Sequence, residues 1–234
     1  MASQNKLVSI VIPVYNEEKT IEEIIRRVSA AKTLDYKKEI ILVDDGSRDG
    51  TRAILQKYKD THRVILQKVN RGKGAALRTG FKHAKGSIII IQDADLEYNP
   101  DEYEKLLKPI IEDNADIVYG SRFVGGDVHR VLNYRHYLGN KVLTGISNLF
   151  SNLKLTDMET CYKVFKKDVL KGILLKSNRF GFEPEFTIKI AKKKYRIYEV
   201  GISYYGRTYE DGKHIGWKDG VNAIWCMLKY SIFD

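Results

Sequence analysis

The stretch Ser87-Ile88-Ile89-Ile90-Ile91-Gln92-Asp93-Ala94-Asp95-Leu96-Glu97 places an unbroken apolar run directly before three carboxylates. Four consecutive isoleucines predict a strand that is buried on both faces, as in a parallel sheet. Ligands of such sheets bind beyond the carboxyl ends of the strands, where Asp93, Asp95 and Glu97 stand. The carboxylates of Asp93 and Asp95 repel each other unless a cation lies beside them, and Mg²⁺ or Mn²⁺ meets that need. The stretch therefore predicts a buried strand that ends in a site for a metal ion and a diphosphate.

Buried strands and amphipathic helices alternate on both sides of this stretch. Further strands are predicted at residues 7–12, 39–43, 64–66, 117–119, 161–165 and 197–202, and helices at 75–83, 101–112, 134–150, 184–194 and 220–233. Strand-helix-strand units of this length form right-handed crossovers. The pattern predicts an α/β fold with a mostly parallel central sheet and helices on both faces. The polar loops at 13–17, 44–49, 93–97 and 120–122 then converge on one edge of the sheet.

The composition is that of a globular protein without covalent or zinc cross-links. The chain has 234 residues, of which 43% are hydrophobic and 30% charged. Its two cysteines, Cys161 and Cys226, form no CxxC pair, which excludes a disulfide framework and a structural zinc site. No apolar run reaches the ~18 residues of a membrane-spanning helix, and the first residues lack the pattern of a signal peptide. We therefore expect a cytoplasmic protein.

Positive charge is concentrated in the second half of the chain. Residues 1–121 carry 20 Lys and Arg against 19 Asp and Glu, whereas residues 122–234 carry 20 against 11. This asymmetry predicts that the second half meets an anionic partner. A nucleic-acid-binding protein is a remote alternative, because acidic residues at one sheet edge would repel a nucleic acid, so no nucleic-acid partner is expected.

Two further polar segments are informative by their spacing. Asp44 and Asp45 follow the second strand and can accept hydrogen bonds from a nucleoside or cap the next helix. Residues 70–76, Asn-Arg-Gly-Lys-Gly-Ala-Ala, lack the G-x-x-x-x-G-K-[ST] spacing of a phosphate loop, and no G-x-G-x-x-G follows the first strand. These patterns exclude a P-loop enzyme and a dinucleotide dehydrogenase. Glu183 and Glu185 are interpreted as acids at the start of a helix.

In order and spacing, seven blocks of the chain resemble family 2 glycosyltransferases, and within them the polyprenyl-phosphate (dolichyl-phosphate) mannose and glucose synthases. The blocks are residues 10–17, 43–51, 70–76, 93–97, 120–122 and 157–163, and Arg207. The resemblance implies a GT-A type nucleotide-sugar fold. It also implies one catalytic domain over residues 1–219, with a nucleotide-sugar-binding half (1–121) and an acceptor-binding half (122–219).

The resemblance assigns roles to individual residues of this sequence. The expected nucleotide-sugar contacts are Pro13, Tyr15, Glu17, Asp44, Asp45, Lys73, Asp93, Ala94 and Asp95. The expected metal ligands for Mg²⁺ or Mn²⁺ are Asp93, Asp95 and Glu97, the last at a position where relatives often have Gln. The expected acceptor-phosphate contacts are Arg122, Arg135, Arg207 and Lys213. The expected catalytic residues are Asp93, Asp95, Arg122 and Arg207.

The chemistry of the acceptor decides whether a general base is needed. A phosphate monoester has its second pKa near ~6, so at neutral pH its oxygen is already an anionic nucleophile that cations position. The prediction is direct, metal-assisted, inverting transfer of a hexose from GDP-mannose or UDP-glucose to a polyprenyl or dolichyl phosphate. The alternative is a sugar-hydroxyl acceptor, with Asp157 or Glu159 as the base. With a phosphate acceptor, Asp157 instead holds an Arg or Lys side chain in place.

The C-terminal residues 220–234 form a predicted amphipathic helix with apolar positions at 221, 224, 225, 228 and 232. Such a helix either lies in a membrane interface or packs on the core. The helix around residues 138–150 presents the same choice. A lipid acceptor implies contact with a membrane surface or a membrane partner protein, and peripheral association with the cytoplasmic face of a membrane is expected.

Overall fold

The strand predicted from the four isoleucines is β4 (Ile88–Ile91), which lies at the centre of a seven-stranded sheet. The computed structural model describes residues 6–125, 128, 130–131, 134–207 and 217–233. The strand order is β3-β2-β1-β4-β6-β5-β7. The other strands are β1 (Leu7–Val14), β2 (Lys37–Asp44), β3 (Arg63–Leu66), β5 (Ile117–Ser121), β6 (Lys163–Lys166) and β7 (Ile197–Gly201). All pairings are parallel except those of β6, so the sheet is mostly parallel, as predicted.

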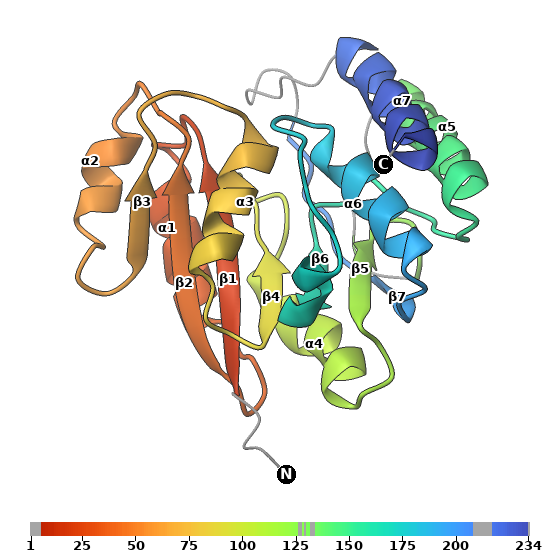
Figure 1. The fold of residues 1–234 in the computed structure, drawn as a ribbon. Coiled ribbons are helices and arrows are strands. Elements are labelled where there is room, and N and C mark those ends of the chain that lie inside the picture. The colour runs from red at the N-terminus through yellow and green to blue at the C-terminus, as the bar shows by residue number, and fades with distance from the viewer. Residues whose placement is uncertain (1–5, 126–127, 129, 132–133, 208–216, 234) are drawn as a thin grey trace.

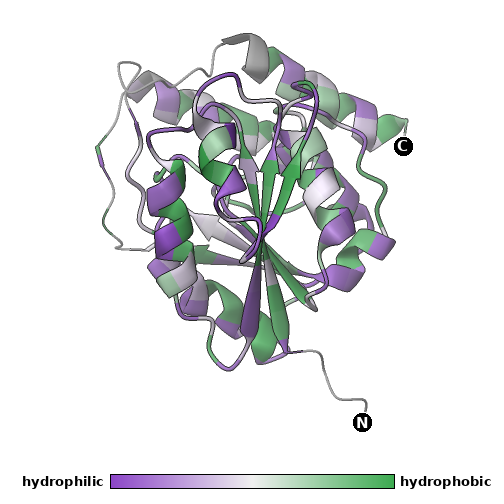
Figure 2. Cartoon of the chain, turned by 90° about the vertical axis from the view of Figure 1, so that its left-hand side faces the viewer, coloured by the Kyte–Doolittle hydropathy of each residue, from purple (hydrophilic) through white to green (hydrophobic). Residues whose placement is uncertain are grey.

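Helices cover both faces of this sheet (Figures 1 and 2). On one face lie α1 (Ile21–Ala30) and α4 (Tyr103–Ile111), preceded by a 3₁₀ turn at Pro100–Glu102. On the other face lie α3 (Lys73–His83) and α6 (Phe182–Lys192), whose rings Phe81 and Phe182 meet at a centroid distance of 6.1 Å. The short α2 (Thr51–Gln56) lies beside β3. Strands β1 and β4 between these layers are almost wholly buried, which explains their continuous apolar sequence.

The strand register brings the predicted polar loops together. Val14 of β1 pairs with Asp44 of β2, and Val11 pairs with Ile91 at the end of β4. The backbone N–H of Gln92 then donates to the carbonyl of Val11 at 3.0 Å, so the acidic loop starts beside the last residues of β1. These loops all emerge at the upper end of the sheet in Figure 1.

Most predicted elements differ from the structure by one to three residues at their ends, and one differs also in its direction. The strand predicted at residues 161–165 is shorter, at Lys163–Lys166, and runs antiparallel between β4 and β5. A four-residue strand carries no sequence signal for its direction, which is set by the chain's route between helices. The C-terminal helix α7 begins at Trp217 and ends at Ile232, so it starts earlier than the predicted residue 220.

The C-terminal helix has one packed and one exposed face. It contacts α5 (Tyr134–Ser151) and α6, beside which it lies in Figure 1. Ala223, Met227 and Tyr230 are buried on its packed face, while Trp225 is exposed on the other. None of the helices built from the described residues has the length and hydropathy that a bilayer crossing requires.

Candidate active site

The polar loops enclose a cavity of about 550 Å³ at the carboxyl edge of the sheet. Twelve predicted site residues line it: Pro13, Tyr15, Glu17, Asp45, Lys73, Asp93, Ala94, Asp95, Glu97, Arg122, Glu159 and Arg207. The side chains of Asp44 and Asp157 are not part of the lining. The side chain of Arg135 and all of Lys213 lie outside the described residues. The cavity thus brings together residues from both halves of the chain.

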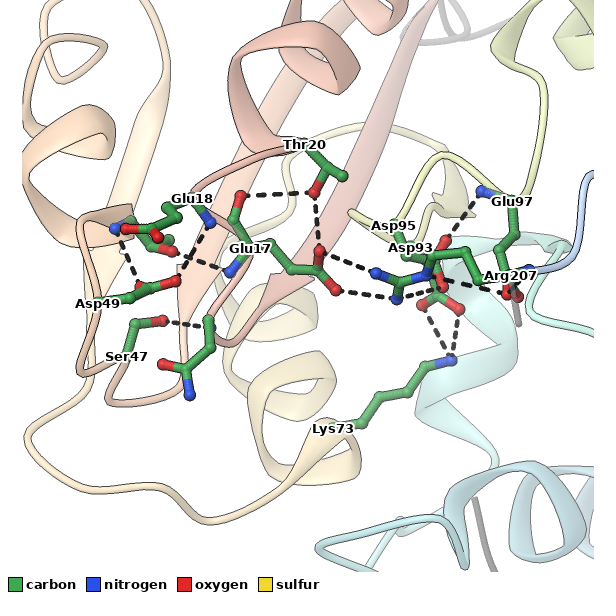
Figure 3. Close-up of polar contacts among 12 residues, drawn as sticks. Glu17, Glu18, Thr20, Ser47, Asp49, Lys73, Asp93, Asp95, Glu97 and Arg207 are labelled. Atoms are coloured by element: carbon green, nitrogen blue, oxygen red, sulfur yellow. Dashed lines mark hydrogen bonds and ion pairs between the residues drawn. The ribbon is translucent and has the colours of Figure 1, made fainter. Parts of the chain in front are cut away.

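Asp93 and Asp95 are each neutralised by a cation from another element (Figure 3). The ammonium of Lys73, at the start of α3, lies 2.9 and 3.0 Å from the two carboxylate oxygens of Asp93. One guanidinium nitrogen of Arg207 lies 3.4 Å from the Asp95 carboxylate. Burial, together with the charges of Asp93 and Glu97, raises the pKa of Asp95 to about 7. Burial and the neighbouring carboxylates thus favour the protonated form of Asp95, whereas the Arg207 guanidinium favours its charged form.

Arg207 joins the segment after β7 to the loops after β1 and β4. Its guanidinium lies 3.1 Å from the Glu17 carboxylate, and its backbone N–H donates to Glu97 at 2.7 Å. The other carboxylate oxygen of Glu97 accepts a 2.7 Å hydrogen bond from the hydroxyl of Tyr204. Glu97 thereby anchors the Arg207 segment, and its assignment as a metal ligand stays a prediction. The Arg207 guanidinium thus lies between Glu17 and the acids of the loop after β4 (Figure 3).

The donor set around Asp93 and Asp95 fits a divalent cation. Carboxylate oxygens are the ligands that Mg²⁺ and Mn²⁺ prefer, and Asp93 and Asp95 both line the cavity two residues apart. Within the described part of the chain, no group of three His, Cys, Asp or Glu side chains is arranged to hold an ion alone. A metal ion at this loop would therefore complete its shell with oxygens of a bound ligand or of water.

The loops after β1 and β2 are tied together by alternating polar side chains (Figure 3). The backbone N–H groups of Asn16 and Glu17 donate to the hydroxyls of Ser47 and Thr51, both at 2.9 Å. The N–H of Glu18 donates to Asp49, 3.3 Å away. These hydrogen bonds explain why hydroxyl and acidic residues stand at positions 47, 49 and 51, a structural role that was not predicted from the sequence. It holds Tyr15 and Glu17 at the cavity wall.

The adjacent acids Asp44 and Asp45 have different roles. The Asp44 side chain is fully buried, and its carboxylate accepts hydrogen bonds from the backbone N–H groups of Gly46 and Ser47. The side-chain Nε of Arg52 lies 2.8 Å from the same carboxylate. The carboxylate of Asp45 lines the cavity and accepts from the N–H of Arg71 and of Gly72 at 3.0 and 2.6 Å. Of the two, only Asp45 is placed to touch a ligand, because the Asp44 carboxylate is taken up by its own turn and by Arg52.

The glycines of residues 70–76 serve close packing between the two halves. Gly72 has φ +96°, and a Cβ there would lie 2.5 Å from the carbonyl oxygen of Asn178. The N–H of Ala75 donates to that same carbonyl at 3.0 Å. The glycine-rich segment therefore seats a loop of the second half against α3 and directs Lys73 into the cavity.

Arg122, at the end of β5, is held by Asp157 in a buried ion pair. Its side-chain nitrogens donate to both Asp157 oxygens at 2.6 and 2.7 Å, and Asn140 of α5 donates to the same carboxylate at 3.3 Å. Burial alone would raise the pKa of Asp157, but the Arg122 guanidinium outweighs it and holds the pKa below its usual value. The geometry therefore gives Asp157 the positioning role that was predicted for a phosphate acceptor. Arg122 itself faces the cavity and lies 5.0 Å from the ring centroid of Tyr204.

The sequence did not predict that the carboxylates of Glu159 and Glu183 line the cavity together. Glu183 lies 3.2 Å from the Lys73 ammonium, and its second carboxylate oxygen is buried without a hydrogen-bond partner in the described structure. Glu159 also has such an oxygen, and burial followed by the charge of Glu183 raises its pKa to about 7. Glu185, by contrast, accepts from the backbone N–H groups of Lys176 and Ser177. Glu183 is thus part of the cavity lining, and only tertiary contacts reveal it.

The fold and the site together define a class: a GT-A type glycosyltransferase. The fold matches that of glucosyl-3-phosphoglycerate synthase from Mycobacterium tuberculosis, a structure with Mn²⁺, UDP-glucose and phosphoglyceric acid, with a TM-score of 0.73. The match covers 96% of this chain and 79% of the other at 20% identity. The family model described as glycosyl transferase family 2 matches residues 9–174. The chain belongs to this family and is a glycosyltransferase, which confirms the resemblance.

Several relatives are named for transfer to lipid phosphates. Dolichol-phosphate mannosyltransferase from Pyrococcus furiosus is 33% identical over 217 residues, 89% of this chain and 60% of the relative. Undecaprenyl-phosphate 4-deoxy-4-formamido-L-arabinose transferase from Pseudomonas syringae is 44% identical over 215 residues, 89% and 61% of the two chains. The chain therefore spans about 60% of these two transferases. An uncharacterized protein from Methanocaldococcus jannaschii is 32% identical over 229 residues, 96% of this chain and 92% of the relative.

Proposed function

We propose that this glycosyltransferase moves a hexose from a nucleotide-sugar, GDP-mannose or UDP-glucose, to the phosphate of a polyprenyl or dolichyl lipid. The observation that carries the proposal is the placement of Arg122 and Arg207 in the same cavity as Asp93 and Asp95. Carboxylates for a metal-bound diphosphate and cations for a second phosphate thus share one cavity. The names of the two lipid-phosphate transferases above support the same acceptor class.

The donor half of the cavity is built by the first half of the chain. Asp45 and Tyr15 line the side at which the loops after β1 and β2 meet, which suits the base and ribose of the donor. Asp93 and Asp95 would hold a divalent metal ion. When bound, Mg²⁺ or Mn²⁺ would offset the charge that develops on the departing nucleoside diphosphate. Lys73, beside Asp93, places a further cation near the same oxygens.

The acceptor half positions a nucleophile that needs no base. An anionic phosphate oxygen attacks the anomeric carbon, the bond from that carbon to the diphosphate breaks, and the electron pair leaves with the diphosphate. Arg122, oriented by Asp157, presents a fixed guanidinium to the acceptor phosphate. Arg207 lies between Glu17 and Asp95 and can exchange its carboxylate contacts for phosphate oxygens. Attack on the side opposite the leaving group gives inversion.

The test is transfer of label from a panel of GDP- and UDP-sugars into a short polyprenyl phosphate with Mg²⁺ or Mn²⁺. We expect one donor to label the lipid and Asp95→Ala and Arg207→Ala to abolish labelling. Asp168→Ala, at an exposed residue outside the cavity, serves as the matched control and should retain activity. Metal-dependent binding of a nucleotide-sugar without labelling of any lipid phosphate would contradict the proposed acceptor.

A second candidate function is transfer to a sugar hydroxyl, which needs a general base. The observation that favours it is Glu159, which lines the cavity with a pKa raised to about 7, near that of an effective base at neutral pH. Asp157 is less suited to this role because Arg122 occupies both of its oxygens. Transfer to glycan acceptors that Glu159→Gln abolishes would favour this candidate.

We also propose peripheral contact with the cytoplasmic face of a membrane. The exposed side of α7 presents Val221, Trp225 and Ile232, with Lys229 on the same helix, and the exposed Phe233 follows its last residue. Apolar and aromatic side chains next to a cation suit the interface of an anionic bilayer. Co-sedimentation of the protein with anionic vesicles, reduced by Trp225→Ala, would support this; equal recovery with and without vesicles would contradict it.

A further inference from the structure

Helix α5 turns polar residues, together with the half-buried Leu143 and Ile146, to the protein and carries a second, largely apolar stripe on the side turned to solvent. Asn140, Thr144 and Asn148 bind the segment 155–158 through hydrogen bonds. The exposed stripe consists of Tyr134, Tyr137, Leu138, Lys141 and Val142. This spacing of i, i+3, i+4, i+7 and i+8 is the pattern that a helix normally turns to a core. Among the described residues, most of this stripe is exposed to solvent and not packed on a core.

Phe123 connects this stripe to the cavity. It directly follows Arg122, whose guanidinium lies 5.6 Å from the Phe123 ring centroid. On its other side, the Phe123 ring meets the ring of Tyr137 edge to face at 5.4 Å. The ammonium of Lys141 lies 5.5 and 5.6 Å from the centroids of these two rings. An aromatic and cationic cluster of Phe123, Tyr137 and Lys141 thus extends outward from the guanidinium that faces the reacting phosphate.

The charge around this cluster suits an amphiphile with an anionic head. The sequence of α5 contains no Asp or Glu between Tyr134 and Ser151. Among the described residues, Lys141 contacts aromatic rings and no carboxylate within ion-pair distance. A phosphate would be attracted inward past Lys141 toward Arg122, while an attached hydrocarbon would lie on the rings.

We infer that Phe123, Tyr137 and Lys141 form a subsite for the phosphate-proximal isoprene units of the lipid acceptor. The inference rests on the proposed function and adds the residues that select an isoprenoid over a small phosphate ester. The stripe continues along α5 through Leu138 and Val142, and α5 itself packs against α7, the helix that faces the proposed membrane. The subsite contributes affinity for the hydrocarbon and leaves the reacting groups unchanged.

The test compares two phosphate esters, farnesyl phosphate and glycerol phosphate, by calorimetric binding to the protein saturated with metal and nucleoside diphosphate. Tyr137→Ala should weaken binding of farnesyl phosphate by about 10-fold, the loss typical of one aromatic contact with its buried area. Binding of glycerol phosphate should change less than about 2-fold, because that ester has no isoprene unit to rest on the ring. Tyr137→Phe, which keeps the ring, should bind both esters like the wild type.

Leu149→Ala is the matched control, since Leu149 is 80% exposed on the same helix but lies about three turns beyond Tyr137. Equal effects of Tyr137→Ala and Leu149→Ala on farnesyl phosphate, or an equal loss for both esters, would overturn the subsite. The binding readout does not depend on sugar transfer. If Tyr137→Ala selectively weakens farnesyl phosphate but no sugar reaches any lipid, the subsite stands and the proposed transfer fails.

Discussion

Asp157→Asn should destabilise the protein strongly, because it leaves the Arg122 guanidinium buried without its counter-charge. The Asp157 side chain is fully buried and that of Arg122 is 15% exposed, and they share two short charged hydrogen bonds. Removal of one partner of such a pair typically costs about 3–5 kcal/mol. In a domain of this size a loss of about 3 kcal/mol lowers Tm by about 6–12 °C. The free energy of unfolding is measured by urea titration at pH 7.

The control is Asp168→Asn, which removes the charge from an exposed ion pair with Lys171. Both side chains of that pair are more than three-quarters exposed, so we expect a change below about 1 kcal/mol. A double-mutant cycle with Arg122→Gln then isolates the buried interaction, and we expect a coupling of at least about 2 kcal/mol. Equal stability of the Asp157→Asn and Asp168→Asn variants would refute the assignment of Asp157 as the residue that holds Arg122.

The pH dependence of this effect has a defined sign. The pKa of Asp157 is lower in the folded state than its ordinary value, since Arg122 outweighs the effect of burial. The stabilisation is therefore complete above the unfolded pKa of about 4 and is lost as the pH falls through the folded pKa. The difference in unfolding free energy between wild type and Asp157→Asn should shrink in acid and be constant from pH 6 to 8.

Three further predictions test the cavity and the sheet edge. Gly72→Ala should lower the free energy of unfolding by about 2 kcal/mol or more, seen in a urea titration, because a Cβ there would lie 2.5 Å from a backbone oxygen at a positive φ. Glu183→Gln should lower the pKa of Glu159 from about 7, followed by carboxyl NMR titration, because the charge of Glu183 contributes to raising it. Arg196→Gln should lower the free energy of unfolding at pH 7, because Arg196 holds the pKa of Asp116 below its usual value. The loss should shrink as the pH falls toward that lowered pKa, and unfolding measured at neutral and at acid pH tests this.

Much of the fold follows from local sequence because each central strand is buried on both faces. The isoleucine run of β4 and the apolar run of β1 have few alternatives, and parallel strands place their following loops at one edge. The positions of Asp93 and Asp95 in the cavity could therefore be predicted. The different roles of Asp44 and Asp45 could not be predicted in this way, because the turn after β2 and the distant residues Arg71 and Gly72 determine them.

The remaining features depend on contacts between residues far apart in the chain. Glu183 stands in the first turn of α6, where an acid is expected for local reasons, and only the approach of Lys73 places it in the cavity. Glu97 has the spacing of a metal ligand, yet its oxygens hold Tyr204 and the backbone of Arg207. The antiparallel β6 is equally non-local, since the residues of β4 and β5 that pair with it lie 44 or more positions earlier, as Tyr119 does from Lys163.

Contacts within the protein itself account for part of the uneven distribution of charge along the sequence. The acids that line the cavity from the first half include Glu17, Asp95 and Glu97, and Arg207 from the second half contacts all three. Part of the positive excess after residue 121 therefore balances carboxylates of the first half across the cavity. A phosphate-bearing ligand would replace the carboxylates as the partner of Arg207. A divalent cation would replace Arg207 as the partner of Asp95. The two ligands should consequently bind cooperatively, since either one alone leaves a charge of the opposite sign without its partner.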